Sequence, residues 1–183
     1  MTLVTIGKEY KVWQAAATAK DRPILNYICL SRGYAVATNG YILAAVPAPG
    51  SEDLDGVLVP ASLVKEAKGN YIGIEDGYAV LFGVRHPLGE GTFPNWRRLF
   101  PDGAPQENAA GSFDGKQLAL VAEAVGVTGG VYPVGSSTSA RVIVGAGDAL
   151  GLIMPAQKTA PAVPEIDRRL NLMRTPAALA IAS

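Results

Sequence analysis

The sequence is poor in the residues that most often carry catalysis and metal binding. It contains one cysteine and one histidine among 183 residues. Cys29 cannot form an internal disulfide, which is typical of reducing compartments, and its apolar neighbours favour a buried inert thiol over a nucleophile. His86 alone cannot build a histidine metal cluster or a Ser-His-Asp triad, and its place before a proline favours an ordinary surface histidine. We therefore expect no enzyme activity, no cofactor and no metal site.

Net charge and long apolar runs are also lacking. Sixteen basic and sixteen acidic side chains cancel, which gives no support to a generally basic nucleic-acid surface. No apolar run approaches the roughly 18 residues that a membrane span needs, and the N-terminus has no basic start of a signal peptide. Since 49% of the residues are hydrophobic and 17% are charged, the chain has the composition of a folded domain. We expect a soluble, cytoplasmic protein.

What the sequence does contain is a threefold alternation of one amphipathic helix with several strands. Apolar residues at helical spacing predict helices over 8–19, 61–68 and 114–125. Alternating or apolar runs between turn residues predict strands over 24–30, 34–38, 41–46, 57–60, 71–75, 78–84, 131–134, 140–144 and 150–154. Because hairpin turns outnumber crossovers, we predict an α+β fold with antiparallel sheets and one helix per unit on one face.

The same pattern predicts the organisation of the chain. Residues 1–101 would form a domain of two helix-plus-strands units, 102–155 an additional half-domain unit, and 156–183 a linker and C-terminal tail.

Two loops have compositions that resemble ligand-binding loops. The stretch 145–148 (GAGD) lacks the spacing of a phosphate loop and joins two strands, so we interpret it as a hairpin turn. The stretch 52–55 (EDLD) lacks further oxygen ligands and is interpreted as a solvated acidic loop.

Three separated segments contain residue patterns that the formation of an ordinary β-sheet does not explain. They are ATNGYILA at 37–44, FPNWRRLFP at 93–101 and LIMP at 152–155. In this order they resemble the bacterial DNA sliding clamp, the β subunit of the replicative DNA polymerase. The stretches RPILN at 22–26 and VLVP at 57–60 resemble further elements of the same family, so that the similarity extends from about residue 3 to residue 155. The resemblance implies a clamp-like fold.

The resemblance also implies a site and its partners. In the sliding clamp the three segments meet in a hydrophobic cleft that captures short linear peptides from DNA polymerases and from other replication and repair proteins. Carried over residue by residue, the cleft would consist of Leu25, Thr38, Gly40, Tyr41, Leu43, Pro94, Arg98, Leu99, Leu152, Met154 and Pro155. Leucine, methionine and proline side chains make an adaptable apolar groove, and an arginine at its rim can orient a peptide. The alternative is that these residues only close a core where two units meet.

Several positions depart from the family pattern. Asn39 replaces an aspartate in the hairpin, Ile42 replaces an arginine, and 156–158 (AQK) replaces the closing M-R-L. The chain has about half of the family's length, and three units cannot close a ring in the familiar arrangement. The resemblance therefore leaves open both the formation of a homo-oligomer and the encirclement of DNA.

The DNA-binding residues implied by the resemblance are cations on or beside the three predicted helices. They are Lys8, Lys11, Arg22, Lys65, Lys68 and Lys116. Their charges are partly compensated by three glutamates on the same predicted helices, Glu9, Glu66 and Glu123. A solvent-exposed helix face without function is therefore an equal alternative to a surface that binds DNA phosphates.

The tail stretch 169–173 (RLNLM) resembles the core of clamp-binding peptides and would occupy the cleft of its own chain or of a neighbouring one, or it would cover apolar surface as a helix. The sequence thus favours a clamp-like accessory protein of DNA replication or repair, with a peptide-sequestering regulator that does not bind DNA as the alternative.

Overall fold

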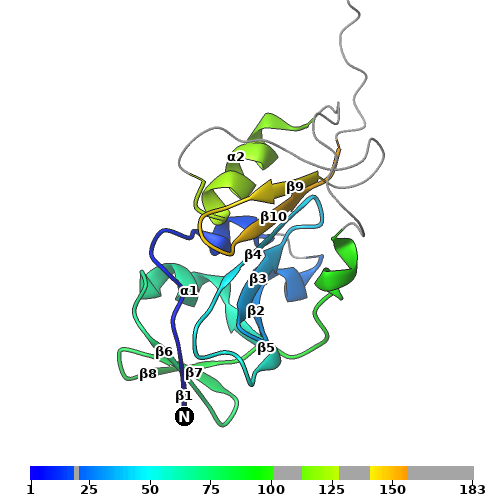
Figure 1. Ribbon diagram of the computed structural model, residues 1–183. Coiled ribbons are helices and arrows are strands. Elements are labelled where there is room, and N and C mark those ends of the chain that lie inside the picture. The colour runs from blue at the N-terminus through cyan, green and yellow to red at the C-terminus, as the bar shows by residue number, and fades with distance from the viewer. Residues whose placement is uncertain (19–20, 101–112, 128–140, 156–183) are drawn as a thin grey trace, which may run out of the picture.

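The computed structural model describes residues 1–18, 21–100, 113–127 and 141–155 of the chain. Within these residues the protein consists of two antiparallel sheets, two α-helices and three short 3-10 helices (Figure 1). The predicted strand 131–134 and the tail 156–183 lie outside the described residues.

The larger sheet has six strands, and every neighbouring pair is antiparallel. Its order is β5 (Asp55–Pro60), β2 (Tyr27–Ser31), β3 (Tyr34–Thr38), β4 (Ile42–Pro47), β10 (Leu150–Ile153) and β9 (Arg141–Val144). The β9–β10 hairpin belongs to the third predicted unit, yet it pairs with β4 of the first unit. Segments more than a hundred residues apart therefore lie side by side in one sheet (Figure 1).

The smaller sheet has four strands. Its order is β1 (Thr2–Val4), β6 (Ile72–Glu75), β7 (Tyr78–Leu81) and β8 (Val84–Pro87). The helical elements are η1 (Val12–Ala15), η2 (Pro23–Asn26), α1 (Ala61–Ala67), η3 (Trp96–Leu99) and α2 (Gly115–Ala124). Helix α1 contacts β5, β2 and η1, whereas α2 contacts η1, β10 and β4.

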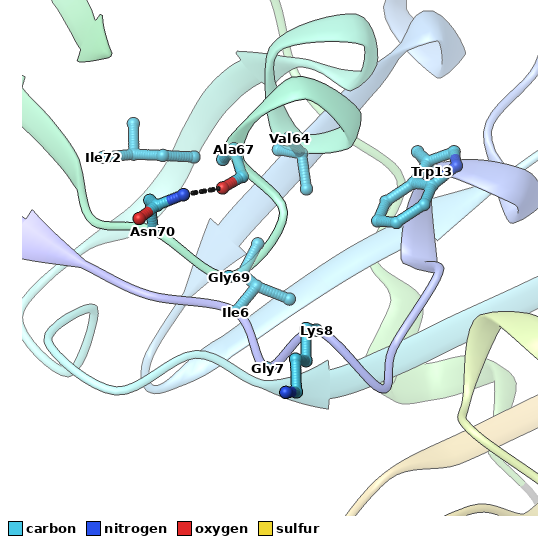
Figure 2. A pocket seen from close by; sticks show the side chains of 9 residues that line it. All are labelled: Ile6, Gly7, Lys8, Trp13, Val64, Ala67, Gly69, Asn70 and Ile72. Atoms are coloured by element: carbon cyan, nitrogen blue, oxygen red, sulfur yellow. Dashed lines mark hydrogen bonds between the residues drawn. The ribbon is translucent and has the colours of Figure 1, made fainter. Parts of the chain in front are cut away.

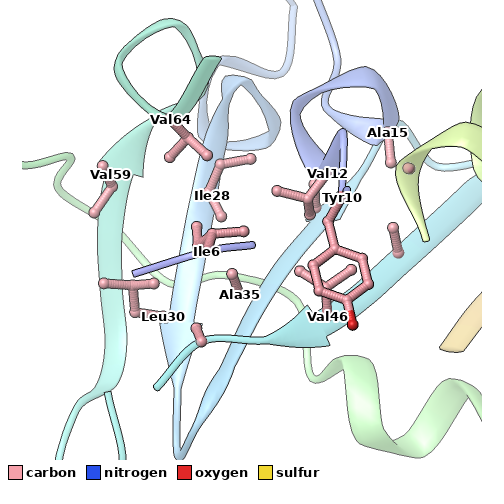
Figure 3. Close-up of a cluster of buried hydrophobic side chains, with 14 of the residues drawn as sticks. Ile6, Tyr10, Val12, Ala15, Ile28, Leu30, Ala35, Val46, Val59 and Val64 are labelled. Atoms are coloured by element: carbon pink, nitrogen blue, oxygen red, sulfur yellow. The ribbon is translucent and has the colours of Figure 1, made fainter. Parts of the chain in front are cut away.

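The main hydrophobic core covers the inner face of the six-stranded sheet. Ile28 and Leu30 of β2, Ala35 of β3 and Val46 of β4 point toward residues of η1 and α1 such as Val12 (Figure 3). The four-stranded sheet and α2 contribute to the same cluster. The six-stranded sheet is buried on both faces along much of its length. The sequences of its central strands β3 and β4 are therefore nearly continuous apolar runs that do not alternate between apolar and polar residues.

The predicted first helix over 8–19 is wrong in extent and type. Only four residues, Val12–Ala15, are helical, and they form a 3-10 turn. Ala16 is extended, and the backbone N–H of Ala17 donates to the carbonyl of Leu25 at 2.8 Å. Tyr10 is buried, and its hydroxyl donates to the carbonyl of Ala146 at 3.1 Å. Burial of Tyr10 and pairing with the segment before β2 therefore override the local helical pattern.

Two further predictions need correction. The predicted strand 78–84 is two strands, β7 and β8, joined by a turn at Phe82 and Gly83, where φ is +50° and +81°. The predicted strand 24–30 begins as the 3-10 helix η2, which starts at Pro23 and accounts for residues 23–26.

Other predictions are confirmed. Strand β3 has the predicted bounds, and α1 and α2 agree with the predicted helices within one residue at each end. Asp114 caps α2, because its carboxylate accepts hydrogen bonds from the backbone N–H groups of Lys116 and Gln117 at 2.9 and 3.1 Å. The stretch 145–148 lies in the turn between β9 and β10, as interpreted. No helix among the described residues is long and apolar enough to cross a membrane.

Candidate functional site

The outer face of the six-stranded sheet carries a second hydrophobic cluster, and the predicted cleft residues gather around it. Leu43 of β4 and Leu152 of β10 lie opposite one another in register. Both are buried, and both belong to the same cluster as Leu25 and Phe93. Residues from the first, second and third resembling segments thus meet on one face of the sheet.

The turn between β3 and β4 is held by side-chain hydrogen bonds. Thr38 donates its hydroxyl to the carbonyl of Ile42 at 2.6 Å and accepts from the N–H of Gly40 at 3.1 Å. The amide oxygen of Asn39 accepts from the N–H groups of Tyr41 and Ile42 at 2.9 and 3.0 Å. Gly40 has φ of +92°, which a residue with a side chain rarely adopts. The asparagine that replaces the family's aspartate therefore retains the acceptor that this turn needs.

Asn39 also ties the turn to the third unit. Its amide nitrogen donates to Oε1 of Gln117 on α2 at 2.9 Å. On the other side of the turn, the N–H of Met154 donates to the carbonyl of Tyr41 at 2.9 Å. Tyr41 and Met154 are 67% and 50% exposed, so two large side chains flank the turn in contact with solvent.

Residues 93–100 pack across the outer face and orient the double arginine. Trp96 lies between Tyr34 and Phe100, with ring centroids 6.1 and 6.0 Å away. The Arg97 guanidinium lies 4.2 Å from the centre of the Trp96 ring. It also donates to the hydroxyl of Ser31 at 2.9 Å and to the carbonyl of Ser31 at 3.3 Å. Arg97 is thus bound to the sheet, although both Arg97 and Arg98 are exposed.

The eleven predicted cleft residues divide by burial into an inner and an outer set. The inner set, which is buried, consists of Leu25, Thr38, Leu43 and Leu152. The outer set, which is exposed, consists of Gly40, Tyr41, Pro94, Arg98, Leu99 and Met154. Pro155 is half-buried. The buried set contains three leucines, and the exposed set contains both apolar side chains and the cation of Arg98. Membership of the cleft stays a prediction for all eleven.

Arg22, whose contact with DNA stays a prediction, lies at the β3–β4 turn. One of its guanidinium nitrogens is 3.4 Å from the point where a Cβ on Gly40 would stand. This placement was not predicted from the sequence. A signal for it existed, since Arg22 is the first residue of the RPILN segment that leads to the predicted cleft residue Leu25. The arrangement places a second cation beside the predicted cleft, in addition to Arg98.

The predicted DNA-binding lysines are all exposed, yet one of them is paired. Lys11 lies 2.9 Å from the carboxylate of Glu123, which also accepts a hydrogen bond from Gln14 at 2.7 Å. The hydrogen bond from Lys11 and that from Gln14 hold the pKa of the Glu123 carboxyl below its usual range. The remaining lysines are Lys8, Lys65, Lys68 and Lys116. Their contact with DNA stays a prediction.

An open cavity of about 600 Å³ lies between β2, β5 and the segment 91–97. Cys29 lines it but is itself buried, and burial raises the pKa of its thiol to about 11. The thiol is therefore protonated at neutral pH, which agrees with the predicted inert cysteine. At the cavity edge Arg32 pairs with Asp55 at 2.9 Å, and the hydrogen bond from Ser31 lowers the pKa of the Asp55 carboxyl.

A second cavity, beneath α1, is too small to hold a ligand. It lies between Trp13, Val64 and Ile72, near the hydrogen bond from Asn70 to the carbonyl of Ala67 (Figure 2). Its volume of about 10 Å³ corresponds to a single water molecule at most. Among the described residues no group of three or more histidine, cysteine or carboxylate side chains is placed to hold a metal ion.

Comparison with known proteins identifies the fold. No protein-family model and no curated protein matches the chain. Among solved structures, the DNA polymerase III subunit beta from Borrelia burgdorferi is similar with a TM-score of 0.63 at 13% identity. The Caulobacter crescentus pol III beta gives 0.61 at 16% identity, and the sliding clamp from Bartonella birtlesii gives 0.60 at 16%. The chain thus has the fold of these sliding clamps, which confirms the α+β clamp-like fold predicted from the sequence.

The match covers most of this chain and a smaller part of the others. It covers 87% of this chain and 65% of the Borrelia burgdorferi protein. For the Caulobacter crescentus and Bartonella birtlesii proteins the shares are 86% of this chain and 66% of the other. The chain therefore spans about two thirds of these sliding clamps, more than the half expected from the sequence.

Proposed function

We propose that the protein is a non-catalytic, clamp-like accessory protein of DNA replication or repair that docks partners through short linear peptides. The observation that carries the proposal is the meeting of three distant segments on the outer face of the six-stranded sheet. Leu43 and Leu152 supply a buried apolar surface there, and Tyr41 and Met154 are exposed beside it. The partners are DNA polymerases or other replication and repair proteins that carry such peptides.

The apolar and cationic character of this surface indicates which peptide it would bind. Leucine and phenylalanine side chains of the peptide would bury the exposed surface of Tyr41, Leu99 and Met154, which gives most of the affinity. Arg22 and Arg98 would donate hydrogen bonds to the carbonyl and polar side-chain groups of the peptide. The surface would therefore favour a short apolar motif flanked by neutral or acidic residues.

The test is a fluorescence-anisotropy titration with a labelled peptide of sequence QLSLF. We expect the wild-type protein to bind it and Met154→Asp to weaken binding at least tenfold, because the new carboxylate would have to be desolvated against the peptide. Val84→Asp is the matched control, because Val84 is similarly exposed, at 56%, but lies on the four-stranded sheet. Absence of binding to the wild-type protein would remove the proposal.

A second candidate function is a peptide-sequestering regulator that does not contact DNA. It is favoured by the pairing of Lys11 with Glu123 and by the zero net charge of the chain. Both candidates use the same peptide surface, so only DNA binding separates them. Contact with double-stranded DNA belongs to the first candidate alone, whereas assembly into a homo-oligomer is proposed with either.

The division of the chain belongs to the same proposal. Residues 1–101 would act as a two-unit clamp-like domain, 102–155 as an additional half-domain unit, and 156–183 as a linker and tail. Pairing of β10 with β4 supports a function in which the third unit completes the peptide surface of the first.

A further inference from the structure

Exposed large hydrophobic side chains among the described residues fall into two groups. One lies on or next to the four-stranded sheet and consists of Met1, Leu3, Tyr71, Tyr78, Phe82 and Val84. The other surrounds the outer face of the six-stranded sheet and consists of Tyr41, Leu99, Val144, Leu150 and Met154. Within the second group, Val144 and Leu150 lie opposite one another on β9 and β10 and are not part of the predicted cleft. Apolar surface therefore continues beyond the cleft.

A cavity of about 240 Å³ opens at this end of the sheet, and we refer to it as the aromatic cavity. Three rings line it, those of Tyr34, Trp96 and Phe100. The Tyr34 and Trp96 rings are tilted by 59°, and the Trp96 and Phe100 rings meet edge to face at 76°. Ala45 and Leu150, which lie opposite one another on β4 and β10, line the cavity from the sheet.

The aromatic cavity and the predicted cleft share the same two strands. Leu43 and Leu152 form the next same-face pair after Ala45 and Leu150 in the β4–β10 register. Side chains two residues apart on a strand point to the same face and are about 7 Å apart. The segment that supplies Trp96 and Phe100 to the cavity also supplies the predicted cleft residue Leu99. A peptide in the cleft would therefore reach the aromatic cavity with two or three further residues.

The charges at the cavity indicate what kind of side chain it would accept. Arg97 and Asp148 both line it, so their charges balance. The Arg97 guanidinium is already bound to Ser31 and to the Trp96 ring. A charged side chain would meet both a repulsive and an attractive group, and it would lose its hydration against three aromatic rings. A neutral aromatic side chain would gain ring–ring contacts and bury its surface.

We propose that the aromatic cavity is a second anchor pocket for the partner peptide, and that it takes a phenylalanine or tyrosine located two or three residues from the core motif. The inference rests on the proposed function, because the same peptide occupies the cleft. It adds a specificity rule, since peptides with an aromatic residue at that spacing bind more tightly than those with the core alone.

The experiment compares extended peptides in the same anisotropy assay. QLSLF is lengthened at either end by two glycines and then phenylalanine, alanine or lysine. We expect phenylalanine at one of the two ends to lower the Kd about tenfold relative to alanine, as the burial of one aromatic ring allows. Lysine at the same position should give no gain.

Two protein variants locate the gain. Leu150→Asp changes a residue that lines the aromatic cavity and is not one of the predicted cleft residues, so it should abolish the advantage of phenylalanine and leave the affinity for QLSLF unchanged. Trp13→Phe leaves Trp96 as the single tryptophan of the chain. In that variant the emission of Trp96 should shift with the phenylalanine-extended peptide and stay constant with the alanine-extended one. This second readout does not depend on whether Leu150→Asp folds.

The outcomes separate the inference from the proposed function. If QLSLF binds and phenylalanine gives no gain at either end, or if lysine gives an equal gain, the anchor pocket is overturned and the proposed function stands. If phenylalanine gives a gain that Leu150→Asp retains and Trp96 emission stays constant, the aromatic residue binds elsewhere and the inference also falls. If no peptide binds the wild-type protein, the proposed function fails and the anchor pocket fails with it.

Discussion

At the scale of single residues, Asn39 is the position where a departure from the family pattern has a clear physical meaning. Its amide oxygen accepts two backbone hydrogen bonds in the β3–β4 turn, as a carboxylate could. Its amide nitrogen additionally donates to Gln117 of α2. One side chain thereby fixes the turn next to the predicted cleft and connects it to a helix 78 residues away in sequence.

Replacement of this side chain tests both contributions. We expect Asn39→Ala to lower the free energy of unfolding by about 1 kcal/mol, because the backbone N–H groups of Tyr41 and Ile42 lose their acceptor and exchange it for water. Asn39→Asp should be close to neutral, since the carboxylate keeps both acceptor positions and Gln117 can rotate its amide to donate. Urea unfolding of the three proteins measures the difference. Equal losses in both variants would show that the hydrogen bonds within the turn contribute little.

At the scale of elements, the β9–β10 hairpin depends on close contact with α2. A Cβ on Gly151 would lie 2.6 Å from a methyl carbon of Val121 and 3.3 Å from Cβ of Ile143. Glycine is therefore what lets the helix approach the strand that carries Leu152. The position of the hairpin, and with it part of the peptide surface, is set by this contact.

We expect Gly151→Val to destabilise the protein by about 1–3 kcal/mol, because the added side chain must displace α2 or β10. The same variant should weaken binding of QLSLF, since Leu152 and Met154 lie on or next to β10. Gly115→Ala is the control, because a Cβ at Gly115 meets nothing within 4 Å and alanine favours the helix by up to about 1 kcal/mol. Urea unfolding and peptide anisotropy follow both effects, and unchanged stability of Gly151→Val would contradict the tight contact.

The elements that the sequence predicts well are those with strong local signals. Helix α2 has a capping aspartate and a glycine after its last turn, and α1 is followed by Lys68 and Gly69, both with positive φ. The 8–19 segment has a helical pattern, but burial of Tyr10 and the bond from Ala17 to Leu25 are long-range contacts that no local pattern encodes. The turn at Phe82 was missed because phenylalanine rarely adopts positive φ.

The candidate site was predictable only in part. The resemblance of three segments predicted that they meet, but local patterns do not tell which side of a short segment is buried. Trp96 packs inward and Leu99 is exposed, although both are large apolar residues in one 3-10 turn. The placement of Arg22 beside Gly40, and the aromatic cavity, depend on tertiary contacts and were not predicted.

At the scale of the whole molecule, the distribution of charge determines how DNA would be bound. The exposed lysines belong to separate short elements, and Lys11 is neutralised by Glu123. Each phosphate contact contributes a salt-dependent increment to affinity, so that a few contacts give weak binding that salt removes readily. The charge pattern therefore predicts that any binding to DNA is weak and is removed by moderate salt.

We expect weak binding to a labelled DNA duplex at about 50 mM salt that is largely lost at about 200 mM. Lys65→Glu combined with Lys68→Glu should weaken it further, because both side chains are exposed on or directly after α1. The Val84→Asp variant serves again as the unaffected control. If the wild-type protein does not bind duplex DNA at low salt, the peptide-sequestering regulator becomes the preferred function.

The pairing of β10 with β4 has a consequence for how the chain avoids association with other chains. Residues 42–46 of β4 are all buried and apolar, and they would form an unpaired strand edge if the β9–β10 hairpin were absent. Long, exposed, hydrophobic edges recruit strands from other molecules and lead to aggregation. The β9–β10 hairpin of the third unit therefore covers the edge of β4 and keeps it from pairing with other chains. A fragment that ends before α2 should precipitate or self-associate where the longer chain does not.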